Sequence, residues 1–194
     1  SKYRIVGEPT AIAAELIKLI PAKESTKHLD LITEAGEKVL STANRHLENY
    51  KSINEPSVIR NTVRILGQKN ICGLFVANSM PIRDADTFCC SLPPFLRIAA
   101  NRGASGIDGN IASAIGFGRG LNKVVTLIIG DLAFIHDLSS LSQLNYMNKG
   151  MIIVVINNKG GGIFSMLPIA KIASADTFDR YFNTPHTVDL KSIA

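Results

Sequence analysis

The sequence is poor in the residue patterns that mark several common classes of protein. It contains three cysteines among 194 residues. Cys89 and Cys90 are adjacent, and neither forms a CxxC pair with Cys72. This number and spacing disfavour a disulfide framework or a zinc site and lean toward a reducing compartment. The histidines are also scattered, without the spacing of metal ligands; they are His28, His46, His136 and His186.

Long apolar runs and basic clusters are missing as well. The longest apolar runs, residues 124–129 and 151–156, have the length of strands, whereas a membrane-spanning helix needs about 20 residues. The net charge of +5 is modest, and no basic run is interleaved with aromatic residues, so nucleic-acid binding is not indicated. With 46% hydrophobic and 19% charged residues, the chain can form a packed core and is not of a disordered type. The length fits one domain, or one domain plus part of another.

Apolar runs of strand length alternate with helical patterns along the chain. Strands are expected at residues 3–7, 72–77, 97–100, 124–129 and 151–156. Helices are expected at residues 10–20, 29–50, 56–68, 110–121 and 138–147, and another is expected to begin near Phe164. This alternation predicts an α/β fold, with a mostly parallel sheet that has helices on both faces.

Polar residues directly follow three of the expected strands, as Asn78-Ser79, Gly130-Asp131 and Asn157-Asn158. Ligands of parallel sheets bind outside the carboxyl ends of the strands. Asn158 follows Asp131 by 27 positions (158 − 131), which leaves room for a loop, one helix and one strand. Two neighbouring strands would then bring a carboxylate and an amide oxygen to the same edge. Such oxygens suit Mg²⁺, which takes further ligands from water and phosphate, so a Mg²⁺-bridged diphosphate is predicted at this edge.

Each motif taken singly also has an ordinary structural interpretation. An Asp after a strand commonly caps the next helix, and two Asn before a glycine run can form a simple turn. The pairing of the two motifs at this spacing favours the metal site over these alternatives. His136-Asp137 is interpreted structurally, with Asp137 capping the helix expected to start near Leu138.

The pairing of Gly-Asp with Asn-Asn resembles the cofactor motif of thiamine diphosphate (ThDP) enzymes. Residues 78–84 (NSMPIRD), 101–109 (NRGASGIDG) and 162–168 (GIFSMLP) narrow the resemblance. Together they resemble the SEPHCHC synthase family (2-succinyl-5-enolpyruvyl-6-hydroxy-3-cyclohexene-1-carboxylate synthase) of menaquinone and phylloquinone biosynthesis. The resemblance covers about residues 56–190. The first fifty or so residues resemble, more weakly, the end of that family's central domain.

The resemblance implies two cofactors, ThDP and Mg²⁺ or Mn²⁺. It implies that Asp131, Asn158 and the backbone oxygen of Gly160 hold the metal ion. Ile107 would be the apolar wedge that bends ThDP, which itself supplies the carbanion chemistry. The positions that match cofactor-binding residues of the family are Gly106, Ile107, Gly130, Asp131, Leu132, Ala133, Asn158 and Gly160.

The resemblance also implies the reaction and its substrates. The family decarboxylates 2-oxoglutarate on ThDP and adds the resulting succinic semialdehyde unit to isochorismate. Both substrates carry carboxylates, which the rigid fork of arginine matches. The matching substrate positions are polar Ser79, Arg83 and Arg102 and an apolar wall of Ile163, Phe164 and Leu167. As lone residues, the arginines would be solvated surface charges and the apolar residues ordinary packing.

Finally, the resemblance implies a domain organisation. Residues 1–52 would be the tail of the central domain with a connecting helix, and residues 53–194 the ThDP diphosphate-binding domain, incomplete at its C-terminal end. The catalytic glutamate would come from a separate pyrimidine-binding domain without a counterpart here, so the isolated chain is expected to be inactive. The family works as a homodimer or homotetramer in bacterial cytoplasm or plastid stroma. The alternatives are another ThDP-dependent 2-oxo acid decarboxylase or carboligase, or a non-catalytic remnant of the ThDP fold.

Overall fold

The structure is a computed structural model that describes residues 4–21 and 26–193. The chain divides into two compact units, Ser1–Arg45 and His46–Ala194. The first unit contains α1 (Pro9–Leu19) and most of α2 (Lys27–Asn49), so the two helices expected in this part are confirmed to within two residues. The strand expected at residues 3–7 is not formed by residues 4–7, and residue 3 lies outside the described part of the chain. No helix among the described residues is long and apolar enough to cross a membrane.

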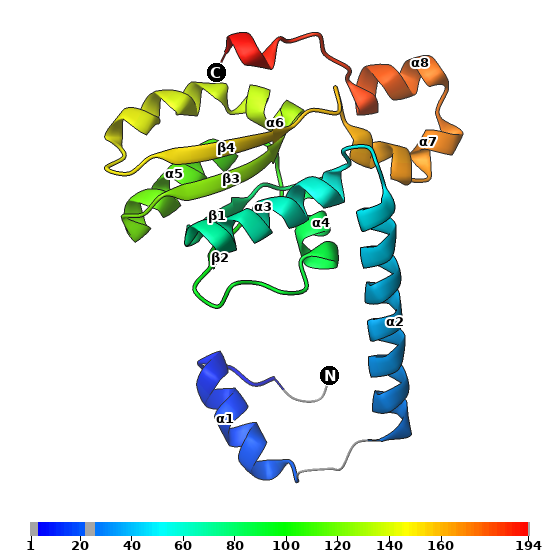
Figure 1. Ribbon diagram of the computed structural model, residues 1–194, viewed down its shortest axis with the longest axis vertical. Coiled ribbons are helices and arrows are strands. Elements are labelled where there is room, and N and C mark those ends of the chain that lie inside the picture. Colours follow the sequence, from blue (N-terminus) through cyan, green and yellow to red (C-terminus); the bar gives the residue numbers. More distant parts are fainter. Residues whose placement is uncertain (1–3, 22–25, 194) are drawn as a thin grey trace. The chain divides into compact units, whose positions relative to one another are not determined.

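The second unit is built on a parallel four-stranded sheet (Figure 1). Its strands are β1 (Gly73–Val76), β2 (Arg97–Ala99), β3 (Val125–Gly130) and β4 (Met151–Ile156). They pair in the order β2-β1-β3-β4, and every pairing is parallel. All four strands lie where the apolar runs predicted them.

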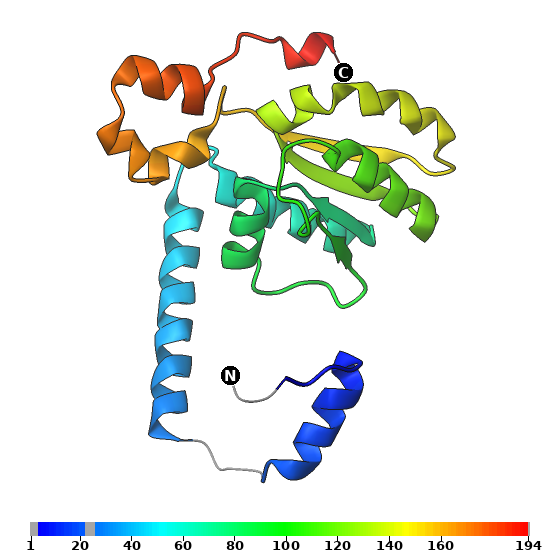
Figure 2. The same ribbon diagram turned by 180° about the vertical axis from the view of Figure 1, so that it is seen from behind.

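Helices cover both faces of this sheet because side chains alternate between the faces along each strand. Leu74 and Val76 of β1 pack with Ile59 and Val63 of α3 (Glu55–Lys69). Phe75 and the odd-numbered residues of β3 pack on the opposite side against α5 (Asn110–Leu121). Figure 2 shows this second layer from behind. The predicted α/β class, with a parallel sheet and helices on both faces, is confirmed.

Three helical segments differ from the expectation. Helix α4 (Met80–Phe88) is not among the expected helices. Pro81 lies in its first turn, where a missing N–H disrupts no helical hydrogen bond. The helix expected at 138–147 is a 3₁₀ helix, Leu138–Tyr146, and α6 (Asp131–His136) precedes it. The helix expected near Phe164 is a 3₁₀ turn, Gly162–Met166. The remaining short elements are α7 (Ile169–Ile172), α8 (Ala175–Phe178), the π-helical turn Asp179–Asn183 and the 3₁₀ turn Leu190–Ser192.

The strand order creates a switch point between β1 and β3. From β1 the chain first builds β2 on one side and later β3 on the other. Crossover connections on either side of such a point leave a crevice at the carboxyl ends of the two strands. Asn78 follows β1 there, and Asp131 follows β3.

Candidate functional site

Asp131 is the most deeply placed polar residue at the end of β3. It is the first residue of α6, and 2% of its surface is exposed. Its Oδ1 accepts a hydrogen bond from the backbone N–H of Leu132 at 2.7 Å, and its Oδ2 accepts one from Gly160 at 3.1 Å. The carboxylate is thus held between its own helix and the turn that follows β4.

A histidine that the sequence patterns did not indicate completes the surroundings of this carboxylate. His186 Nε2 lies 3.1 Å from Asp131 Oδ2. The backbone N–H of Val188 donates to His186 Nδ1 at 3.2 Å. Nδ1 is therefore an acceptor, so Nε2 carries the proton and donates to Asp131. No spacing rule could have found this contact, because it joins residues 55 positions apart through the tertiary fold.

Asn158 lies beside Asp131, as the pairing of strand ends predicted. Its Oδ1 accepts a hydrogen bond from the Gly160 N–H at 3.2 Å, so one N–H bonds the side chains of both predicted ligand residues. The Asn158 amide nitrogen donates to Oε1 of Glu55, the first residue of α3, at 2.9 Å. This contact fixes which end of the amide is the oxygen. Glu55 is a second residue at the site that the sequence patterns did not indicate.

A side chain at position 160 would require the turn to rearrange. A Cβ at this position would lie 2.5 Å from the backbone oxygen of Asn183. The preceding residue, Lys159, has a φ of 65°, a left-handed conformation that few non-glycine residues adopt. Gly161 is similarly crowded, because its Cβ would meet the backbone oxygen of Phe182. The glycines are thus needed for close approach of the turn to residues 182–183.

The oxygen atoms at this edge retain capacity for a cation. Asp131 Oδ1 and Asn158 Oδ1 each accept one hydrogen bond in the structure, and each oxygen has a second lone pair. No group of three His, Cys, Asp or Glu side chains that could hold a metal ion occurs in the described part of the chain. A hard cation here would bind one carboxylate oxygen and one amide oxygen and take its other ligands from backbone, water or phosphate oxygens. This pattern is typical of Mg²⁺.

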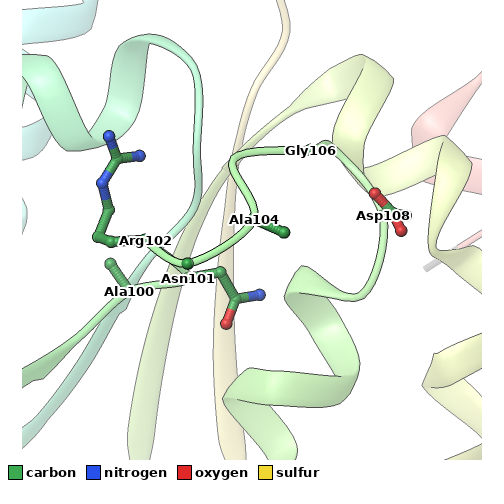
Figure 3. A pocket seen from close by; sticks show the side chains of 7 residues that line it. Ala100, Asn101, Arg102, Ala104, Gly106 and Asp108 are labelled. Atoms are coloured by element: carbon green, nitrogen blue, oxygen red, sulfur yellow. The ribbon is translucent and has the colours of Figure 1, made fainter.

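Residues 100–104, Gly106 and Asp108, in the segment that directly follows β2, line a pocket of about 430 Å³ (Figure 3). Arg102 and Asp108 lie at opposite ends of the curved backbone, with their side chains on opposite sides in this view. Arg102 Nη1 donates to Oδ1 of Asn78 at 3.0 Å. Gly106 and Ile107 lie on the same curve, and the side chain of Ile107 is partly exposed. Two of the predicted cofactor positions, Gly106 and Ile107, and one predicted substrate position, Arg102, therefore share one loop.

Ser79 and Arg83 are placed together at the start of α4. Ser79 has a φ of 73°, which is rare for a residue other than glycine and marks a strained backbone. Its backbone oxygen accepts a hydrogen bond from Arg83 Nη1 at 2.7 Å. Arg102 contacts Asn78, the neighbour of Ser79. All three polar substrate positions thus gather around the carboxyl end of β1.

Asp84, also on α4, is a buried carboxyl group with incomplete hydrogen bonding. It is 3% exposed, and its Oδ2 has no hydrogen-bond partner in the structure. Burial, with a smaller contribution from the negative charge of Glu55, raises the pKa of Asp84 to about 6. Glu55 therefore interacts with both residues: it accepts a hydrogen bond from Asn158, and its negative charge contributes to the raised pKa of Asp84.

The three residues of the predicted apolar wall differ in how far they are buried. The ring of Phe164 packs against Phe182, with centroids 5.8 Å apart, and Phe182 stacks on Phe178. Ile163 is half-buried in the same 3₁₀ turn, whereas Leu167, directly after it, is exposed. Phe164 thus takes part in packing the segment after the glycine run, which was the alternative interpretation of this residue.

Asp137 caps a different helix from the one expected. Its Oδ2 accepts hydrogen bonds from the backbone N–H groups of Ile111 at 2.5 Å and Ala112 at 3.2 Å, in the first turn of α5. Its Oδ1 accepts one from the Ser140 hydroxyl. In the 3₁₀ helix Leu138–Tyr146, which follows Asp137, no backbone N–H donates to the Asp137 side chain. The expected cap was wrong because tertiary packing brings the end of α6 against the start of α5.

This chain is similar to a known domain family and to individual known proteins. Residues 89–194 match the family model of the thiamine pyrophosphate enzyme C-terminal TPP binding domain. The chain is also similar to proteins named 2-succinyl-5-enolpyruvyl-6-hydroxy-3-cyclohexene-1-carboxylate synthase. It is 45% identical to the one from Chlorobium phaeobacteroides over 185 residues, 91% of this chain and 30% of that protein. It is 44% identical to the one from Rubrobacter xylanophilus over 161 residues, 83% of this chain and 26% of that protein.

A third relative, from Chlorobaculum parvum, carries the same name and is 38% identical over 191 residues. That match covers 98% of this chain and 32% of the relative. The chain therefore spans at most about a third of the length of these curated relatives.

Proposed function

Because this chain belongs to the thiamine pyrophosphate enzymes, whose C-terminal domain matches residues 89–194, we propose that it is part of a SEPHCHC synthase. The reaction is the decarboxylation of 2-oxoglutarate and the addition of the succinic semialdehyde unit to isochorismate, in menaquinone or phylloquinone biosynthesis. The observation that carries the proposal is the 45% identity to a relative of that name across 91% of the chain.

The cofactors in this proposal are ThDP and Mg²⁺, with Mn²⁺ as a substitute ion. Asp131 and Asn158 would hold the ion through the Oδ1 atom of each, which accepts one hydrogen bond in the structure, with the Gly160 carbonyl as a third ligand. The diphosphate would lie against Gly130, Leu132 and Ala133; nothing lies within 4 Å of where a Cβ of Gly130 would be. ThDP, when bound, supplies the electron sink that decarboxylation needs.

The chain's own residues would bind and orient the reactants. Ile107 would support the bent cofactor, with the loop carbonyl of Gly106 beside it. Arg83 and Arg102, with Ser79, would bind the substrate carboxylates through charge-assisted hydrogen bonds. Their position around the end of β1, next to the 430 Å³ pocket, supports this assignment. Ile163 and Leu167 would form the apolar wall of the substrate site together with Phe164.

We also propose the domain organisation that the resemblance implies, with residues 1–52 as the tail of a central domain and residues 53–194 as the diphosphate-binding domain. No described residue of α1 or α2 is buried. Leu19 of α1, for example, is 77% exposed. Apolar side chains of this kind are covered in a larger domain. A homodimer or homotetramer in bacterial cytoplasm or plastid stroma is proposed from the resemblance alone.

The experiment that tests the proposal is a comparison of substrates with the complete protein. With ThDP, Mg²⁺ and isochorismate present, we expect CO₂ release from 2-oxoglutarate and little release from pyruvate. Turnover of pyruvate at an equal or higher rate would overturn the proposal in favour of another ThDP-dependent carboligase. No turnover of either acid, with ThDP bound, would favour the non-catalytic alternative. The isolated chain is expected to be inactive on both.

A further inference from the structure

Asn78 stands at the end of β1 and uses both ends of its amide. It is 2% exposed. Its Oδ1 accepts a hydrogen bond from Arg102 Nη1 at 3.0 Å. Its Nδ2 donates to the carbonyl oxygen of Gly106 at 2.7 Å, with the carbonyl of Ala104 at 3.5 Å. One side chain therefore bonds the arginine at one end of the loop and the backbone just before Ile107 at the other.

Asn110, the first residue of α5, completes the same network. It is fully buried, and its Nδ2 donates to the carbonyl oxygens of Ile107 at 2.9 Å and Asp108 at 3.3 Å, with Gly106 at 3.5 Å. Its Oδ1 accepts from the backbone N–H of Asn78 at 3.4 Å. The carbonyls of Ala104, Gly106, Ile107 and Asp108 are thus bound by two amide nitrogens.

The amide of Asn78 satisfies two partners of opposite kind. The side chain meets a donor, the guanidinium of Arg102, and an acceptor, the Gly106 carbonyl. A carboxylate offers acceptors alone, and an apolar residue of the same shape offers neither. Because the site is buried, a mismatch at either end leaves a polar group unpaired, which is costly.

We propose that Asn78 is a positioning residue that couples the substrate arginine, Arg102, to the cofactor loop that carries Ile107. The inference rests on the proposed function for the roles of Arg102 and Ile107, and the network itself rests on the hydrogen bonds above. Through Asn78, the orientation of Arg102 and the course of residues 104–107 are set together. Asn110 bonds the loop carbonyls and the backbone N–H of Asn78, and none of its hydrogen bonds involves Arg102.

The decisive experiment measures ThDP affinity in the complete protein, with Mg²⁺ and without any substrate. Arg102→Met removes the group that bonds Asn78 Oδ1. If Arg102 served the substrate alone, ThDP affinity would not change. We expect ThDP affinity to fall about tenfold, the consequence of one unpaired buried amide oxygen. Unchanged ThDP affinity in Arg102→Met overturns the coupling.

Two Asn→Asp variants test the two ends of the network separately. Asn78→Asp retains an acceptor for Arg102 but sets an oxygen against the Gly106 carbonyl, so we expect weaker ThDP binding and a raised KM for 2-oxoglutarate. Asn110→Asp should weaken ThDP binding about tenfold with little change in that KM. Wild-type ThDP affinity in both variants would contradict the proposal.

Asn61→Asp is the matched control. Asn61 is exposed on α3, and its Oδ1 also accepts from an arginine, Arg64, at 3.3 Å. We expect wild-type values for ThDP affinity and KM. A fall equal to that of Asn78→Asp would overturn the positioning role. The proposed function is tested separately by the wild type: if it binds no ThDP, the function and this inference both fail, whereas wild-type binding with an unaffected Arg102→Met removes the inference alone.

Discussion

Gly160 donates its backbone N–H to Oδ2 of Asp131 at 3.1 Å, which ties the turn after β4 to the carboxylate at the end of β3. The same N–H lies 3.2 Å from Oδ1 of Asn158. A diphosphate bridged by a cation at this edge would depend on both side-chain oxygens and on the close turn that aligns them.

Asp131→Ala should abolish Mg²⁺-dependent ThDP binding in the complete protein. The substitution removes the only carboxylate of the proposed metal site, and we expect the affinity for ThDP to fall by more than about a hundredfold. Isothermal titration with ThDP at saturating Mg²⁺ measures it. Asp86→Ala, an exposed position on α4, should leave the affinity unchanged. Unaltered binding by Asp131→Ala would refute its role as a ligand.

Gly160→Ala should lower both ThDP affinity and thermal stability. The added Cβ would lie 2.5 Å from the backbone oxygen of Asn183 and must displace the turn that carries Asn158. We expect a loss of about 1–3 kcal/mol in the free energy of unfolding. Gly116→Ala is the contrasting control, since it lies exposed in α5 with nothing near its Cβ position. That change should stabilise by about 0.5–1 kcal/mol. Equal melting temperatures for the two variants would contradict the role of the turn.

The elements that local patterns determine were predicted well. Helix α5 and strand β4 begin and end at the predicted residues, because the apolar period and the flanking glycine and asparagine mark them clearly. The placement of Asp131 beside Asn158 also followed from strand ends alone. Contacts such as His186 with Asp131 and Asp137 with α5 were not predictable, because they join residues 55 and 26 positions apart without a local signal. Helix α4 was not predicted, although Pro81 lies in its first turn, a position where proline is favourable.

Asp137→Ala should destabilise the second unit through α5. Two N–H groups of the first turn of α5 lose their acceptor, together with a negative charge next to that helix end. We expect the free energy of unfolding to fall by about 2 kcal/mol in urea titrations. Asp189→Ala removes an exposed cap from the short 3₁₀ turn Leu190–Ser192 and should lower the free energy of unfolding less than Asp137→Ala does. The reverse ranking of the two variants would show that the Asp137 cap contributes little.

Asp84→Asn should change how stability depends on pH. The folded protein holds the pKa of Asp84 at about 6, above the ordinary value of 3.8. Below pH 3.8 both states are protonated. Between these values the unfolded chain releases its proton first, so the stability of the wild type falls as the pH rises toward 6 and stays lower above it. The variant lacks this loss and should be more stable at pH 7.5, by up to about 3 kcal/mol.

Thermal unfolding midpoints of wild type and Asp84→Asn at pH 4 and pH 7.5 test this prediction. The two proteins should differ little at pH 4 and clearly at pH 7.5. Asp86→Asn, exposed on the same helix, should show no such divergence. A constant difference between wild type and Asp84→Asn at both pH values would mean that folding does not shift the pKa of Asp84.

The most direct test of the metal site is anomalous diffraction from crystals of the complete protein grown with ThDP and Mn²⁺. We expect one Mn²⁺ peak at coordination distance from an Asp131 carboxylate oxygen and from Asn158 Oδ1, with two ThDP phosphate oxygens on the same ion. Bound ThDP with the ion elsewhere, or with Asn158 turned away from it, would contradict the site at the ends of β3 and β4.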